Sequence, residues 1–417
     1  CWKRAYYADG AFSLGLTWSW LCFECGARVS HAGLMPKFDV PAILRSLPIV
    51  AMDEASGAGT VQSYRDYATG CRYGPQWEAT NVRARFDEVR VPMLLVGGWY
   101  DYYAGETFAN LAALCERGAP QVRDSHRVLI GPWTHGINAN TTLGELDFGS
   151  EAIAENDCTT RWLECMLAGR PAEEFQQAPI RLFVMGANLW RDEHEWPLAR
   201  TQWASYYLRS SGRLDLEAPE DEPPDEYDYD PDDPVPTLGG NHSIGPYNPG
   251  LYEMAKPGPY DQRPVEARDD VLVYTSEVLA RDLEVTGPVS VTLFASSSAP
   301  DTDFVARLVD VYPDGRAINI TEGVIRARFR DGVWGEPQLM QPGRDYEFTI
   351  DLQATSNLFK AGHCIRLQIT SSCFPLWDRN LNTGNDPATD TEVRVAHQTV
   401  HHDRLRPSRV VLPIANA

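Results

Sequence analysis

The sequence of 417 residues predicts an α/β core accompanied by a helical cap and followed by an all-β domain. Residues 91–136 contain two short apolar runs on either side of an amphipathic stretch, which is the pattern of parallel strands joined by a helix. Beyond residue 236 helical periodicity nearly vanishes, and apolar runs separated by turn residues indicate a β-sandwich or jelly roll. A chain of this length is expected to form two or three domains, each with its own core.

The first part of the chain, residues 1–84, is predicted to be mostly helical and irregular. Its most apolar piece is 14–23, and its short segments are broken by Gly and Pro, as at Gly74-Pro75. This pattern favours a cap over a site rather than a layered core.

Residues 85–198 are predicted to form the C-terminal half of an α/β core. The expected order is a buried strand, a helix with one apolar face, a second strand, a further helix and a third strand. These elements are expected at 91–96, 105–117, 126–130, 150–167 and 180–185.

Residues 199–417 are predicted to form the jelly-roll domain. Within this range, residues 217–236 are rich in acidic residues and proline, which indicates a solvated connector ahead of the main run of strands. Strands are expected where apolar runs lie between turn signals such as Pro313-Asp314-Gly315. These runs are 271–274, 289–295, 304–311, 346–352 and 365–370.

Composition narrows the classes of partner. A net charge of −21 argues against nucleic acid and anionic membrane surfaces, and no apolar run approaches the roughly 20 residues of a membrane span. Of the nine cysteines only Cys22 and Cys25 have a CxxC spacing, so no metal site is expected. The odd number of cysteines favours a reduced, cytoplasmic protein. Because the first residue is Cys1 rather than Met, the natural N-terminus is taken to be absent and a signal peptide can be neither seen nor excluded.

An acid and a histidine follow two consecutive predicted strands. Asp101 comes after Gly97-Gly98 at the end of the first strand, and His135 follows the second. In an open α/β sheet, chemistry collects at the carboxyl ends of neighbouring strands, and acid before histidine matches the second half of a Ser…Asp…His relay of the α/β-hydrolase type. His135 would take a proton and Asp101 would orient its ring. Taken singly, Asp101 could instead cap a helix and His135 could be an ordinary loop residue. Their placement together favours the catalytic interpretation.

The nucleophile of such a relay is not evident in the chain. No Gly-x-Ser-x-Gly turn occurs, and the nearest approximation, around Ser13, is not preceded by a buried strand. Two other glycine-rich pieces, Gly57-Ala58-Gly59 and Gly239-Gly240, lack a following lysine or helix, so phosphate binding is not expected.

The motifs at 98–101 and 131–135 resemble those of the cocaine esterase and X-Pro dipeptidyl-peptidase (S15-type) serine hydrolases. The resemblance continues in order along the chain, through 181–186, 190–192, 196–197, 261–264, 268–272, 285–287, 301–304, 308–311, 313–316, 354–357 and 382–384. It implies an incomplete α/β-hydrolase core with a helical cap and a C-terminal all-β jelly-roll domain, and it assigns Asp101 and His135 to the triad. It also implies that the chain is truncated before or within the cap. The nucleophilic serine, a tyrosine oxyanion donor and the early strands would then lie upstream of Cys1.

The same resemblance suggests two substrate-binding residues. Trp18 resembles the cap tryptophan that lines the acyl pocket, with simple cap packing as an equal alternative. Tyr103 lies where an aromatic residue closes that pocket. Relatives that act on α-amino acid esters carry extra carboxylates directly after the triad acid. Here Tyr102 and Tyr103 occupy that place and Glu106 is already in the helix, which disfavours such substrates.

The sequence therefore predicts a serine hydrolase cleaving small-molecule carboxylic esters without a cofactor, and a chain that is inactive without its upstream segment. One alternative is an acylase or an X-Pro or α-amino-acyl peptidase of the same family. Another is a non-catalytic binding protein whose jelly roll recognises carbohydrate or protein. The presence of both Asp101 and His135 argues against the latter. A homodimer is left open.

Overall fold

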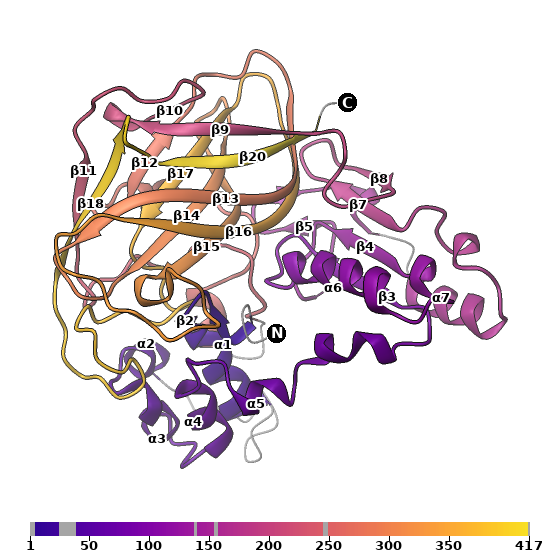
Figure 1. Cartoon of the computed structure of the whole chain (residues 1–417), viewed down its shortest axis with the longest axis horizontal. Helices are drawn as coiled ribbons and strands as arrows, with labels where there is room; N and C mark the ends of the chain where they lie inside the picture. Colours follow the sequence, from indigo (N-terminus) through magenta and orange to yellow (C-terminus); the bar gives the residue numbers. More distant parts are fainter. Residues whose placement is uncertain (1–4, 25–38, 137–139, 154–156, 245–248, 416–417) are drawn as a thin grey trace.

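The computed structural model describes residues 5–24, 39–136, 140–153, 157–244 and 249–415. Figure 1 shows three groups of elements: short helices α1–α5, an α/β layer containing β3, β4, α6 and α7, and a β-rich body that runs to the C-terminus. We call the described residues up to 84 the cap and the residues from Thr201 to Ala415 the β-domain.

The cap consists of a small hairpin and short helices, as expected from its Gly and Pro punctuation. The α2 helix begins at a side-chain cap. The Asp39 side chain accepts a hydrogen bond from the Ala42 N–H at 3.1 Å and so caps the first turn of the helix. Its elements are β1 (Tyr7–Ala8), β2 (Ala11–Phe12), α1 (Leu14–Ser19), the π-helical turn Trp20–Glu24, α2 (Val40–Leu44), the 3-10 turn Ile49–Ala51, α3 (Met52–Ala55), α4 (Gln62–Ala68) and α5 (Pro75–Glu78). The 3-10 segment Val82–Glu88 connects the cap to the α/β layer.

The apolar core of the cap is shared with the β-domain. Trp18, Tyr64 and Trp77 are buried in one cluster together with Leu251 and Phe374. The cap is therefore packed against the β-domain by a common core rather than standing as a separate lid.

A buried ion network joins the cap hairpin to the β-domain. The N–H of Phe12 donates to the Asp378 carboxylate at 2.7 Å, across 366 residues of sequence. Arg326 lies between Asp378 and Asp303, with an N–O distance of 2.8 Å to each, and all three side chains are buried. A charge removed from this network would leave its partners buried and unpaired.

The α/β layer contains a four-stranded sheet in the order β3-β4-β7-β8, in which the first three strands are parallel and β8 is antiparallel. The predicted strands and first helix are confirmed within three residues at their ends. The predicted helix 150–167 is instead a 3-10 turn followed by a separate helix. The elements are β3 (Leu94–Gly98), α6 (Ala104–Arg117), the 3-10 turn Arg123–Ser125, β4 (Arg127–Gly131), β5 (Thr142–Leu143), β6 (Leu146–Asp147), the 3-10 turn Ser150–Ala152, α7 (Cys158–Leu167), the 3-10 turn Ala172–Glu174, β7 (Ile180–Val184) and β8 (Leu189–Glu193).

The β-domain is one mostly antiparallel sheet of twelve strands folded round an apolar core. Its strand path is β11-β18-β13-β20-β9-β10-β12-β17-β14-β15, with β16 pairing with β13 and β19 with β18. The strands are β9 (Thr201–Arg209), β10 (Arg213–Asp215), β11 (Asp225–Tyr229), β12 (Leu272–Thr275), β13 (Leu283–Ser297), β14 (Asp303–Val311), β15 (Ala317–Arg326), β16 (Tyr346–Phe359), β17 (Cys364–Thr370), β18 (Ala396–Asp403), β19 (Arg406–Pro407) and β20 (Arg409–Ala415). Between them lie α8 (Pro249–Met254), α9 (Arg263–Glu266) and the 3-10 turns Ser210–Gly212 and Ala327–Phe329.

The prediction of a solvated connector over 217–236 is wrong in part. Within it, β11 pairs with β18 in an antiparallel ladder. Tyr227 and Tyr229 are buried, whereas Glu226 and Asp228, which alternate with them, are exposed. The alternation of tyrosine with acidic residues is a strand pattern that the high acidic content obscured.

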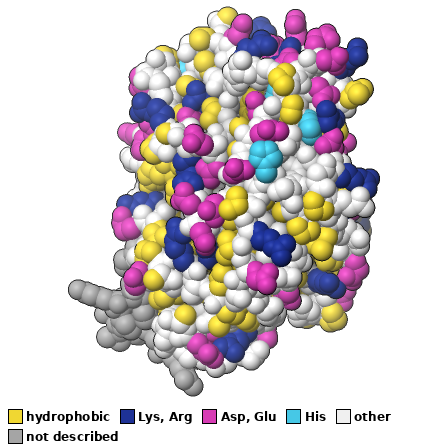
Figure 2. Space-filling view, turned by 90° about the vertical axis from the view of Figure 1, so that its left-hand side faces the viewer, with side chains coloured by type: hydrophobic (Ala, Val, Ile, Leu, Met, Phe, Trp, Pro, Cys, Tyr) yellow, Lys and Arg dark blue, Asp and Glu magenta, His cyan; other side chains and the backbone are white. Residues whose placement is uncertain are grey.

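The surface charge and the potential metal ligands do not point to a particular kind of partner or cofactor. Figure 2 shows acidic and basic side chains interspersed over the face that it views, so the charge of −21 is not gathered there in one acidic patch. Among the described residues no helix has the length and apolar character to cross a membrane, and no group of three or more His, Cys, Asp or Glu side chains could hold a metal. Cys22 is a buried free thiol, while Cys25 lies outside the described residues.

Candidate active site

Asp101 and His135 meet at the carboxyl ends of β3 and β4. Nδ1 of His135 lies 2.8 Å from Oδ2 of Asp101, which is a normal hydrogen-bond length. The Asp101 side chain is 3% exposed, whereas that of His135 is 57% exposed. The hydrogen bond that Asp101 accepts from the imidazole raises the pKa of His135 above its ordinary value. The site thus has a buried carboxylate holding one nitrogen of an accessible imidazole.

The turns that carry the two side chains are bonded to each other. The Trp99 N–H donates to the Gly131 carbonyl and the Tyr100 N–H donates to the Trp133 carbonyl, each at 2.9 Å. These bonds continue the parallel pairing of β3 and β4 past the strand ends. The local sequence therefore fixes the separation of Asp101 and His135 through the backbone.

The Asp101 carboxylate also bonds within the turn that precedes α6. Its Oδ1 accepts the Tyr103 N–H at 3.2 Å, and α6 begins at Ala104. The N-cap of α6 is Tyr103 and no side chain caps the helix, so the interpretation of Asp101 as the helix N-cap is wrong. The two carboxylate oxygens of Asp101 contact the Tyr103 N–H and the His135 ring instead.

Two tyrosine rings lie beside the imidazole of His135. The ring centroid of Tyr102 lies 6.4 Å from that of His135 with the planes 12° apart, and that of Tyr103 lies 5.8 Å away. Burial raises the pKa of both tyrosines, so their hydroxyl groups remain protonated near neutral pH. The structure therefore brings Tyr103 together with the predicted pair.

Trp18 is not brought to this cluster by any contact among the described residues. It is fully buried in the cap, where its ring packs edge-on against Phe23 with centroids 5.1 Å apart. Its indole Nε1 is buried without a hydrogen-bond partner in the described part of the chain. Buried indole N–H groups usually find a partner. The role of Trp18 in an acyl pocket stays a prediction.

An ion pair at the start of α6 was not anticipated from the sequence. The Arg83 guanidinium contacts the carboxylate of Glu106, the acidic residue in the first turn of α6, and also the Asn110 side chain at 2.9 and 3.0 Å. Glu106 lies close enough to Tyr103 to contribute to raising the pKa of that tyrosine. No local pattern links residues that are 23 positions apart, so only the fold reveals the pair.

No serine is bonded to the imidazole among the described residues. In that part of the chain, His135 has a hydrogen bond only with Asp101. Ser13 is buried at the start of α1, where its N–H donates to the Tyr6 carbonyl at 2.9 Å. Ser13 lines a small cavity together with Tyr102. His135 is not among the residues that line this cavity.

A cavity beside the α/β layer does not belong to this site. It has a volume of about 430 Å³ and is lined by Phe108 and Leu111 of α6 and by His126 and Arg127 at the amino end of β4. His135 follows the opposite, carboxyl end of the same strand. Substrate positioned by the Asp101–His135 pair would therefore not occupy this cavity.

Sequence profiles of two families match the chain. One is described as X-Pro dipeptidyl-peptidase (S15 family) and matches residues 2–137. The other is described as the X-Pro dipeptidyl-peptidase C-terminal non-catalytic domain and matches residues 174–411. Cocaine esterase from Rhodococcus sp. (strain MB1 Bresler) is 39% identical over 367 residues, which are 81% of this chain and 59% of that enzyme. The chain thus spans less than two thirds of the length of this relative.

Solved structures share the fold over nearly the entire chain. An aminopeptidase from the marine sediment archaeon Thaumarchaeota archaeon is 25% identical with a TM-score of 0.82, covering 100% of this chain and 70% of its own. An α-amino acid ester hydrolase is 22% identical with a TM-score of 0.84, covering 99% of this chain and 70% of its own. At the latter identity the likeness concerns the fold alone. The predicted fold class, an α/β-hydrolase core with a C-terminal β domain, is confirmed.

Proposed function

The chain belongs to the X-Pro dipeptidyl-peptidase (S15) family of cocaine-esterase-like hydrolases, and on this premise we propose that the whole protein is a serine hydrolase that cleaves carboxylic esters. The observation that carries the proposal is the 2.8 Å contact between Asp101 and His135 at the ends of adjacent parallel strands. A buried acid holding Nδ1 of an accessible imidazole is the half of a catalytic triad that prepares a base.

In the proposed reaction His135 acts twice. Its Nε2 takes the proton of a serine hydroxyl as the serine oxygen bonds to the ester carbonyl carbon, and Asp101 stabilises the imidazolium through Nδ1–H. The imidazolium then gives the proton to the departing alcohol, leaving an acyl-serine. Water hydrolyses this intermediate by the same two proton transfers, which releases the carboxylic acid and restores the serine.

The serine is proposed to lie on a segment that precedes Cys1. Two observations support this: no serine hydroxyl contacts His135 among the described residues, and the chain spans only 59% of the length of cocaine esterase. A hydrolytic site of this class also needs donors for the oxyanion, and we propose that they too come from that segment.

The proposed substrates are small uncharged esters bound between cap and core. The Arg83–Glu106 pair supports this choice, because a carboxylate already paired with a guanidinium is poorly suited to bind a substrate ammonium group. Tyr103 and Trp18 are proposed to contact the acyl group. No cofactor enters the reaction.

A second candidate is cleavage of α-amino-acyl substrates, as in a peptidase. The likeness over the entire chain to an aminopeptidase at 25% identity favours it. The two candidates differ in whether the site binds an ammonium group next to the scissile carbonyl.

The test compares two substrates on the protein with its upstream segment restored. We expect hydrolysis of p-nitrophenyl benzoate, labelling by a fluorophosphonate, and much slower cleavage of alanine p-nitroanilide. Preference for the anilide would establish the peptidase alternative. Residues 1–417 alone are expected to be inert, and fluorophosphonate-sensitive esterase activity from them would direct the search for a nucleophile to Ser13.

A further inference from the structure

We propose that Asn241 of the β-domain is a positioning residue for Asp101, and that the β-domain thereby sets the geometry of the acid–histidine pair. This inference rests on the proposed function, since it concerns the same site. It gives a domain described as non-catalytic in this family a direct part in arranging the catalytic groups.

Two side-chain hydrogen bonds join the β-domain to the turn that ends in Asp101. Nδ2 of Asn241 donates to the Trp99 carbonyl at 2.9 Å. The Tyr100 hydroxyl donates to the Asn319 carbonyl on β15 at 3.2 Å. Asn241, Trp99 and Tyr100 are at most 3% exposed, so neither bond competes with water. The N–H groups of the turn thus bond to the end of β4 and the residues that follow it. The carbonyl of Trp99 and the side chain of Tyr100 bond to the β-domain.

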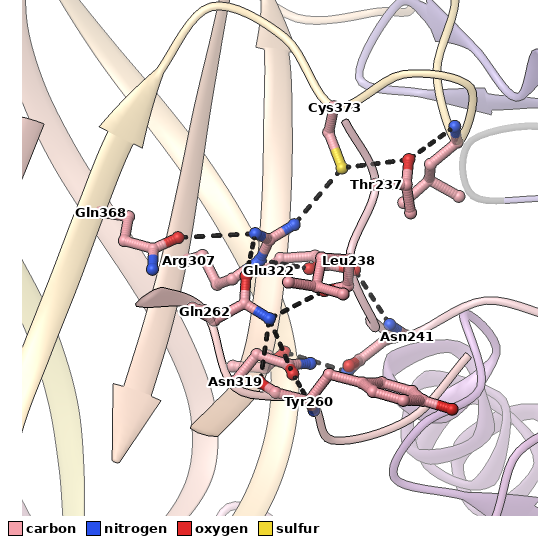
Figure 3. A network of polar contacts seen from close by, with 12 residues as sticks. Thr237, Leu238, Asn241, Tyr260, Gln262, Arg307, Asn319, Glu322, Gln368 and Cys373 are labelled. Atoms are coloured by element: carbon pink, nitrogen blue, oxygen red, sulfur yellow. Dashed lines mark hydrogen bonds and ion pairs between the residues drawn. The ribbon is translucent and has the colours of Figure 1, made fainter. Parts of the chain in front are cut away.

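Asn241 is itself fixed by a buried ion pair, as Figure 3 shows. Its backbone N–H donates to Oε1 of Glu322 at 2.9 Å, and Oε2 of Glu322 accepts from Nε of Arg307 at 2.7 Å. Arg307 donates further to Oε1 of Gln262 at 2.6 Å. The side chains of Arg307 and Glu322 are only 4% and 2% exposed. An anchor held by buried, paired charges has little freedom to shift.

The close approach of Asn241 to Glu322 depends on Gly240. A Cβ on Gly240 would lie 2.0 Å from Oε1 of Glu322, and its φ of +119° is one that residues with side chains rarely adopt. The N–H and carbonyl of Gly240 also exchange hydrogen bonds of 2.9 Å with Gly258. The Gly239-Gly240 pair, for which the sequence offered no ligand, therefore serves to bring the Asn241 backbone against the ion pair.

The consequence for the site is geometric. Trp99 lies two residues before Asp101, so a shift of its carbonyl moves the carboxylate relative to the imidazole. Displacements of about 1 Å at catalytic groups can cost on the order of 100-fold in rate. A residue that prevents such a displacement acts through Asp101 and needs no contact with substrate.

The test measures the pKa of His135 by NMR titration of the 15N-labelled histidine rings in the protein with its upstream segment restored, with His135→Gln identifying its signal. Because Asp101 raises this pKa, the titration reports the acid–histidine contact and needs no nucleophile. Asn241→Leu is expected to lower the pKa by part of the drop caused by Asp101→Asn. Gln398→Leu is the matched control, since this buried amide donates within the β-domain to Thr302 at 2.8 Å.

Tyr100→Phe provides a second, milder variant in case Asn241→Leu does not fold. It removes only the hydroxyl that bonds to Asn319, and Tyr227→Phe is its control, because Tyr227 is a buried tyrosine whose hydroxyl bonds to Ser371 at 2.9 Å. The proposal predicts a lower His135 pKa in Tyr100→Phe and no change in the control.

The outcomes separate the two levels of inference. If Asp101→Asn lowers the pKa of His135 but neither Asn241→Leu nor Tyr100→Phe does, the positioning role is wrong and the proposed function stands. If Asp101→Asn itself leaves the pKa unchanged, the acid–histidine pair fails and the proposed function fails with it. Equal shifts in the test and control variants would assign the effect to general loosening of the β-domain and overturn the proposal.

Discussion

Gly98 lies against Trp133 so closely that a Cβ on Gly98 would be 2.1 Å from the Trp133 carbonyl oxygen. Gly98 is the last residue of β3, and Trp133 lies in the turn that follows β4. The contact therefore sets how near the turn of Asp101 can come to the turn of His135. A glycine is required here by space and not by φ.

Gly98→Ala should separate the two turns. Relief of the overlap needs backbone movement, so we expect a loss of about 1–3 kcal/mol in the free energy of unfolding and a lower pKa of His135. Gly335→Ala is the control, because a Cβ there meets no atom within 4 Å. Urea denaturation measures the change in stability and histidine NMR measures the pKa of His135. An unchanged His135 pKa would show that other contacts set the distance between the two turns.

Asp101→Asn in the whole protein should reduce kcat by roughly 10⁴-fold, the scale known for serine hydrolases that lose this carboxylate. His135 must be neutral to act as a base. The hydrogen bond that His135 donates to Asp101 raises the pKa of His135, so kcat/KM of the native enzyme should rise with pH through a midpoint above the ordinary histidine value of 6.5. The midpoint of the variant should be lower. A pH–rate profile measures this, and identical midpoints would contradict it.

The same pKa has a consequence for stability. Because the folded-state pKa of His135 is raised, its contribution to the free energy of unfolding is fully present below the unfolded pKa and is lost as pH rises through the folded value.

Trp18→Ala should slow the hydrolysis of aryl-acyl esters more than that of acetyl esters, because one aromatic wall of the proposed pocket is lost. Trp18 is fully buried, so the variant is also expected to lose about 3–5 kcal/mol of stability and must be assayed where it remains folded. Ratios of kcat/KM for the two ester classes provide the measurement. Equal losses would mean that Trp18 only packs the cap.

Arg83→Leu should increase the relative activity toward α-amino-acyl esters. The change frees the Glu106 carboxylate from its guanidinium partner and leaves it able to bind an ammonium group near Tyr103. The ratio of kcat/KM for an alanine ester to that for the matching propionyl ester measures the effect. Arg83→Lys, which keeps a charge beside Glu106, should change the ratio less; no rise in Arg83→Leu would place Glu106 out of reach of the substrate.

Arg326→Met should cost about 3–5 kcal/mol in the free energy of unfolding. It leaves the buried carboxylates of Asp303 and Asp378 without the cation that both contact at 2.8 Å. Arg316→Met is the control, since Arg316 pairs with Asp314 on the surface and should have no measurable effect on urea denaturation. Similar losses in both variants would contradict a special role of the buried network.

Local patterns in the sequence were enough to predict the contact between Asp101 and His135. Short apolar strands ending in glycine identify the ends of β3 and β4, and the parallel pairing of such strands brings their following residues together. The resemblance to the family, which also rested on local motifs, is confirmed by the profile matches.

Features that depend on distant residues were not predictable in this way. Arg83 meets Glu106, and Asn241 meets Trp99, only because of how the chain folds. Pro288 was expected to precede a strand, yet β13 begins at Leu283 and passes through it, since a shift of register between Pro288 and Ser290 accommodates the missing donor.

The bond between Phe12 and Asp378 constrains the time course of synthesis. At translation rates of about 5–20 residues per second, Asp378 is made roughly 20–70 s after Phe12, which it follows by 366 residues. During that interval the apolar side chains of the cap have no β-domain to pack against. The cap is thus among the last parts of the described chain to reach its native contacts, and its apolar side chains need protection until the β-domain has been made.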